Sequence, residues 1–140
     1  MWAVLPLLIL PVAGYNLFAL FALPGRMHGD ATPEMARPLM TFAMASHGVW
    51  TVTLSDVLVF GALVILFIEL LKSTHRRDIA IINHSLSMIL FIVCLVEFLL
   101  FRAFATSAFF LITAMVLLDV LAGFIVTIAT TRREIDVGRR

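Results

Sequence analysis

Five ionisable side chains lie inside long apolar stretches of this 140-residue chain. An acidic residue at the centre of a membrane span costs roughly 2.5–3.5 kcal/mol on an insertion scale, so each such residue is a candidate for function. In such places a carboxylate can carry a proton, hold a cation or pair with an imidazole. The five residues are Asp56, Glu69, His84, Glu97 and Asp119.

The spacing of four of these residues predicts two pairs at matching depths. Residues 73–78 predict a tight turn between two antiparallel helices, so residues equally far from that turn lie level in the bilayer. Glu69 is level with His84, which indicates a shared proton or a polar clasp that fixes the helix register. Asp56 is level with Glu97, and because neighbouring carboxylates do not readily both ionise, we expect a shared proton or a cation there.

Supporting polar residues extend these pairs along the helix faces. In the third apolar stretch, the residues that recur at steps of four and three are Asn83, Ser87, Leu90, Cys94 and Glu97. That face should contact protein. Asp119 lies near the middle of the fourth stretch, and Gly123 and Thr127 follow it at steps of four, which favours close helix approach. Arg102 is the cation that could compensate the Asp56 and Glu97 pair.

Four stretches are long and apolar enough to hold these residues inside a membrane. A helix needs roughly 20 apolar residues to cross a hydrocarbon core of about 30 Å. We expect spans at about residues 2–23, 51–71, 79–101 and 107–130, which form an all-α four-helix bundle as a single domain over residues 1–140. We expect the first span to be retained, because no Lys or Arg precedes it and it is too long for a signal core. The composition agrees, since 62% of the residues are hydrophobic and 14% are charged.

The distribution of Lys and Arg predicts the orientation of these spans. Cytoplasmic loops of membrane proteins carry the excess of both residues. Lys72, Arg76 and Arg77 follow the second span and four arginines lie in the tail at residues 131–140, whereas three arginines lie at the opposite ends. We therefore expect both termini in the cytoplasm and the protein in the inner membrane of a bacterium.

The connection between the first two spans contains a predicted amphipathic helix over residues 38–47. A proline at its start and a glycine after its end are typical helix boundaries, and its mostly apolar side chains favour a place at the membrane surface or against the bundle. Met40, Met44 and His47 recur there at helical steps, and such soft ligands suit Cu(I). Methionine is more commonly an apolar filler, so we expect no metal.

Other cofactors and activities have less support. A membrane haem commonly takes two histidines at one depth on facing helices, and His84 has no such partner in the chain. A quinone or another lipophilic molecule would need a pocket between the second and fourth spans. Hydrolase, metalloprotease, P-loop and dinucleotide motifs are missing from the sequence, and a net charge of +1 gives no basic stripe for nucleic acid.

These observations predict a small, non-catalytic accessory or assembly subunit of a larger membrane complex. Its partners would be membrane lipids and other membrane subunits or further copies of the chain. The alternative is an oligomeric small transporter or proton-coupled carrier that uses Asp119, or the Asp56 and Glu97 pair, although the repeats common in transporters are missing from the sequence. A membrane subunit that binds a quinone or another lipophilic ligand is a further alternative.

Overall fold

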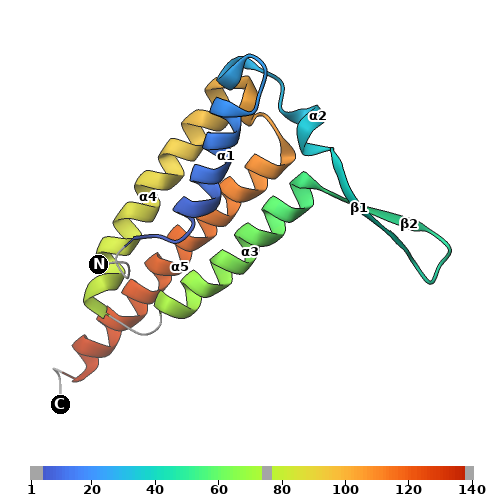
Figure 1. The fold of residues 1–140 in the computed structure, drawn as a ribbon. Coiled ribbons are helices and arrows are strands. Elements are labelled where there is room, and N and C mark those ends of the chain that lie inside the picture. The colour runs from blue at the N-terminus through green and yellow to red at the C-terminus, as the bar shows by residue number, and fades with distance from the viewer. Residues whose placement is uncertain (1–4, 74–76, 138–140) are drawn as a thin grey trace.

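The chain is mostly helical and contains one two-stranded sheet (Figure 1). The computed structural model describes residues 5–73 and 77–137. In chain order the elements are α1 (Ile9–Phe21), η1 (Arg26–His28), α2 (Thr32–Met35), β1 (Pro38–Ala43), β2 (Val49–Thr53), α3 (Leu54–Ser73), α4 (Arg77–Leu100), η2 (Arg102–Phe104) and α5 (Ser107–Val137).

Three helices are long and apolar enough to cross a membrane. Their apolar windows are Leu54–Lys72, Ile82–Leu100 and Ser107–Ile125, close to the predicted second, third and fourth spans. In contrast, α1 has 13 residues, or about 20 Å of helix. That is shorter than the predicted first span, so the described residues support a helical membrane protein with three helices of spanning length.

The helix α5 lies at the centre of the bundle. It packs against both α3 and α4, whereas α3 and α4 pack less closely against each other. Of its apolar window 44% is buried, against 17% for α3 and 22% for α4. Figure 1 shows that α5 ends at the end of the bundle where α3 ends and α4 begins, which we call the α3–α4 end, whereas α1 begins part of the way along the bundle. The opposite end, where α3 begins, is the hairpin end.

An aromatic core holds α1 in place at the hairpin end. The buried Tyr15 ring lies 5.4 Å from the Phe104 ring and 4.8 Å from the Phe109 ring, measured between centroids. Its hydroxyl donates to the Ala103 carbonyl at 3.0 Å and lies 2.7 Å from Thr106 Oγ1. A buried tyrosine hydroxyl needs such partners, and these two join α1 to the connection between η2 and α5.

The predicted amphipathic helix over residues 38–47 is wrong, because this segment forms β1 and pairs antiparallel with β2. The valines, threonines and tryptophan of residues 49–53 have high strand propensity and supply the partner strand. In the connecting loop, the Met44 N–H donates to the Gly48 carbonyl at 2.9 Å, and His47 is left-handed with a φ of 60°. The glycine that suggested a helix end instead closes a hairpin loop.

The β1 and β2 hairpin projects sideways from the bundle (Figure 1). All six residues of β1 and three of the five residues of β2 are exposed. Because the sheet has two strands, each strand has one open edge with unpaired backbone groups. No Asp, Glu, Lys or Arg occurs over residues 38–53, so these edges are not guarded by charge.

The close packing of α4 against α5 depends on a glycine. A Cβ added at Gly123 would lie 2.5 Å from His84 Nδ1 and 3.0 Å from His84 Cγ. We predict that Gly123→Ala forces His84 or α5 to move, at a cost of about 1–3 kcal/mol, and lowers the melting temperature in detergent.

The matched control for this variant is Gly61→Ala on α3. A Cβ at Gly61 meets nothing within 4 Å, and alanine is the better helix former, so this variant should keep or raise the melting temperature. Equal melting temperatures for Gly123→Ala and the parent would show that the two helices separate there without cost.

Candidate functional site

Six polar side chains from three helices gather toward the α3–α4 end. This polar cluster consists of Glu69 and Lys72 of α3, Asn83, His84 and Ser87 of α4, and Asp119 of α5. Glu69, Asn83, Ser87 and Asp119 are buried. Because a buried polar or charged group is costly without hydrogen bonds, the partners of these groups decide what the cluster can do.

Glu69 is fully buried and accepts three hydrogen bonds. Its Oε2 accepts from the Leu7 N–H at 2.8 Å, and its Oε1 accepts from Asn83 Nδ2 at 2.6 Å and from Lys72 Nζ at 3.2 Å. Lys72 Nζ also donates to the Leu5 carbonyl at 2.8 Å. This carboxylate therefore joins α3, α4 and the segment that leads into α1, where backbone N–H groups lack partners within the helix.

Asp119 joins the central helix to α4. Its Oδ2 accepts a hydrogen bond from Ser87 Oγ at 2.6 Å, and both residues are buried. Asp119 also interacts electrostatically with Glu69, His84 and Lys72. Asp119 therefore lies in the bundle interior, near the other buried carboxylate, Glu69.

His84 lies at the contact between α4 and α5. Its ring packs against Gly123 and lies 6.1 Å from the Phe124 ring between centroids. Its Nδ1 and Asn83 Oδ1 are both buried, and neither has a hydrogen-bond partner among the described residues. The predicted pairing of His84 with Glu69 is replaced by Asn83, one residue earlier on α4. The predicted depth was therefore close, and Asn83 belongs to the face of α4 that was predicted to contact protein, on which Ser87, Leu90 and Cys94 are also buried.

The second predicted pair, Asp56 with Glu97, does not form. Asp56 Oδ2 accepts from the Thr53 N–H and from Thr53 Oγ1, both at 2.8 Å, and the Asp56 N–H donates to Thr53 Oγ1 at 3.3 Å. This reciprocal arrangement is a capping box at the start of α3. Glu97 Oε2 accepts from Asn16 Nδ2 of α1 at 3.1 Å. Each carboxylate therefore accepts from a different donor, and the two are not joined to each other.

Arg102 does not compensate Glu97 either. Its guanidinium lies 3.5 Å from Asp30 Oδ2 at the exposed surface. Asp30 also accepts from the Thr32 N–H at 2.9 Å, and this bond is the main reason that the pKa of Asp30 lies below its usual value, with the Arg102 charge adding to it. This ion pair lies outside the polar cluster and brings two surface connections together.

The structure separates the residues considered for metal or haem binding. Met40 lies on β1, and Met44 and His47 lie in the loop after it, so the helical steps that suggested Cu(I) do not apply. His28 lies against the Phe101 ring at 6.1 Å, at the hairpin end, whereas His84 lies in the polar cluster. Over residues 5–73 and 77–137, no three His, Cys, Asp or Glu residues are placed to hold a metal ion.

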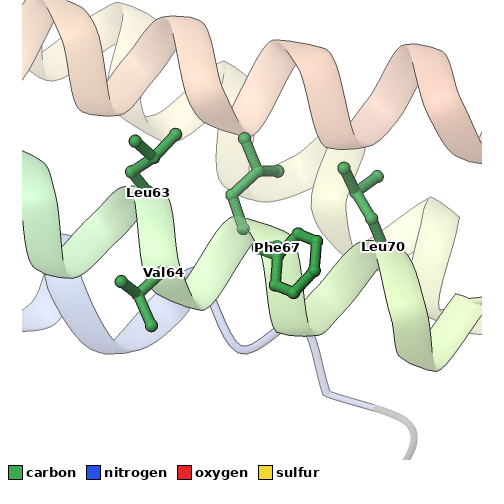
Figure 2. Close-up of a pocket in the computed structure, with 5 residues that line it drawn as sticks. Leu63, Val64, Phe67 and Leu70 are labelled. Atoms are coloured by element: carbon green, nitrogen blue, oxygen red, sulfur yellow. The ribbon is translucent and has the colours of Figure 1, made fainter.

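An apolar groove on α3 bears on the predicted lipophilic pocket (Figure 2). Its lining residues are Leu63, Val64, Leu66, Phe67 and Leu70. In Figure 2 the Leu63 and Leu70 side chains point toward α5, but all the lining residues belong to α3, so the groove is a surface feature of this helix and not the predicted pocket between two spans. All five lining side chains are hydrocarbons, so a quinone carbonyl would find no hydrogen-bond donor among them. The groove suits an acyl chain better than a quinone head.

One backbone partner of Glu69 and one of Lys72 were not predicted from the sequence, and one local signal was overlooked. The Leu7 N–H and the Leu5 carbonyl are backbone groups, which residue types do not reveal. The Thr53 and Asp56 spacing, however, matches the pattern of a capping box and could have been read from the sequence.

Glu69 provides a test of whether the polar cluster stabilises the fold. Glu69→Gln replaces a charged acceptor with an amide that has one acceptor oxygen, so Lys72 or Leu7 loses a partner. We predict a loss of about 1.5–3 kcal/mol in unfolding free energy, measured by denaturation in mild detergent. Glu97→Gln is the control, because its side chain has one hydrogen-bond partner, Asn16, and a glutamine oxygen can still accept that bond. Equal losses in the two variants would contradict a special role for Glu69.

Comparisons of the chain with protein-family models, with curated proteins and with solved structures gave no match.

Proposed function

We propose that this protein is a non-catalytic accessory subunit that joins a larger membrane assembly through the open edges of the β1 and β2 hairpin. In this proposal α1 is the fourth span, both termini face the cytoplasm of a bacterium, and the protein resides in its inner membrane. The hairpin then lies on the outer side. Lys72, Arg76 and Arg77, which follow the second predicted span in the sequence, support this orientation.

The hairpin edges are the observation that carries the proposal. An open strand edge offers a row of backbone donors and acceptors to any chain that approaches it, and proteins commonly guard such edges with charged residues. Residues 38–53 contain no Asp, Glu, Lys or Arg, and the strands are largely exposed. A two-stranded hairpin is also marginally stable alone in water. An added strand from a partner would satisfy the edge and stabilise the hairpin.

The polar cluster supports a structural role over transport. Glu69 accepts from three donors, and Asp119 accepts from Ser87 of the neighbouring helix. A carrier needs carboxylates whose access alternates between the two sides of the membrane. Glu69 and Asp119 instead hold neighbouring helices together. The Asp56 and Glu97 pair, on which the carrier alternative drew, is not formed.

The path of α1 supports four spans. The Leu7 N–H contacts Glu69 near the α3–α4 end, and Tyr15 contacts Thr106 toward the hairpin end. The segment from Leu7 to the end of α1 therefore runs from the level of Glu69 toward the hairpin end, although its helical part is short. Glu69 lies within α3, and Thr106 lies directly before α5, so both contacts are with helices of spanning length or the residue next to one.

Charged substitutions on the hairpin test the proposed contact. Lysine on an edge strand opposes strand addition, so Thr41→Lys with Thr51→Lys should remove a co-purifying membrane protein from the mild-detergent extract. Both threonines are exposed and face each other across the strands, so the two lysines weaken the hairpin by up to about 1 kcal/mol, whereas the melting temperature of the helix bundle should stay the same. The measurement is quantitative mass spectrometry of material purified from the native membrane.

The control for added charge is Ala36→Lys, an exposed position before the hairpin, which should retain the partner. A parent protein that purifies without any stoichiometric partner, or a partner retained by the double-lysine variant, would contradict the proposal. Capture of further copies of this chain alone would show self-association in place of an accessory role.

A further inference from the structure

The strand register divides the hairpin into two faces. Residues opposite each other on antiparallel strands share a face, and successive residues alternate between faces. One face, which we call the aromatic face, carries the pairs Met40 with Val52 and Phe42 with Trp50. The threonine face carries the pairs Thr41 with Thr51 and Ala43 with Val49. The hairpin is therefore amphipathic, with four large apolar side chains on one side.

The aromatic face is uncovered by the bundle. Met40 is 61% exposed, Phe42 47% and Trp50 53%, and the rings of Phe42 and Trp50 lie 5.9 Å apart between centroids. A contiguous apolar patch of this kind normally marks an interaction surface. Its position in the fold indicates what it contacts.

The hairpin leaves the bundle at the boundary of the membrane-crossing segment. The strand β2 ends at Thr53, and the apolar window of α3 begins at Leu54, the next residue. The capping box formed by Thr53 and Asp56 fixes this junction. From there the hairpin runs sideways to the helices, along the direction of the membrane plane (Figure 1).

Neither bulk water nor the hydrocarbon core suits this element. Open strand edges are not tolerated in hydrocarbon, because their backbone groups would have no partners. An exposed face of Met, Phe, Trp and Val is unfavourable in water. The boundary between headgroups and acyl chains satisfies both requirements, and tryptophan is enriched there.

We propose that the hairpin lies flat on the bilayer with its aromatic face inserted among the lipids of that leaflet. The lipid requirement is apolar and not ionic, because residues 38–53 carry no Lys or Arg to attract anionic headgroups. Zwitterionic phosphatidylcholine should therefore suffice. The strand edges and the threonine face remain accessible, so lipid contact and the proposed partner contact use different parts of the hairpin.

Tryptophan fluorescence tests the proposal, because the chain has two tryptophans, Trp2 and Trp50. The full-length Trp2→Phe variant reports Trp50 alone. In phosphatidylcholine vesicles, its emission should be blue-shifted, and lipids brominated near the headgroup should quench it more than lipids brominated near the chain end. Adding anionic phosphatidylglycerol should leave this depth profile unchanged.

Two neighbouring substitutions, made in the Trp2→Phe background, separate the faces. Phe42→Ser removes a ring from the aromatic face and should cause a red shift and a loss of quenching. Ala43→Ser places the same side chain on the threonine face, one residue away, and should leave emission and quenching unchanged. Equal effects of the two substitutions would contradict the assignment of the faces.

Three results would overturn the proposal. Water-like Trp50 emission without lipid quenching would place the hairpin in solvent. Strongest quenching at the chain ends would place it in the hydrocarbon core. Quenching that falls as the protein-to-lipid ratio rises would show that a second copy covers the aromatic face. None of these measurements requires a partner protein, so their outcome is independent of the partner contact proposed above.

Discussion

The bundle depends above all on how the buried carboxylate of Glu69 is satisfied. A carboxylate without water must find donors within the protein, and Glu69 finds them on three segments of the chain, at Leu7, Lys72 and Asn83. The depth of α4 against α3 and the point at which the chain enters α1 are thereby fixed together. Lys72 reinforces this arrangement, because it bonds both Glu69 and the Leu5 carbonyl.

The same principle accounts for the central place of α5. Asp119 bonds Ser87 of α4, and one turn later Gly123 leaves room for the His84 ring of that helix. A side chain at Gly123 would hold α5 away from α4 and lengthen the bond between Asp119 and Ser87. Small and polar residues commonly make interfaces between membrane helices, since lipids do not drive apolar faces together.

The sequence predicted three helices of spanning length, overestimated the first helix, and predicted the contacts between helices only in part. The three long helices were recognisable because crossing hydrocarbon requires a long apolar run, a property of each stretch alone. Depth followed from the antiparallel turn, and the spacing of Asn83, Ser87, Leu90 and Cys94 indicated the face of α4 that is buried. Which residue of α4 meets Glu69 depends on side-chain packing, so Asn83 takes the place expected for His84. Asp56 was assigned a distant partner although its capping residue, Thr53, is three positions away.

The hairpin was misread because proline and glycine bound helices and hairpins alike, and because pairing between β1 and β2 is not local to either strand. The function proposed for the hairpin follows from the geometry of a sheet. The faces of a sheet and its edges point in perpendicular directions, so a hairpin that rests one face on lipid still offers its edges along the membrane plane. In the proposed arrangement, a neighbouring membrane protein would meet those edges at the depth where its own strands or loops leave the bilayer.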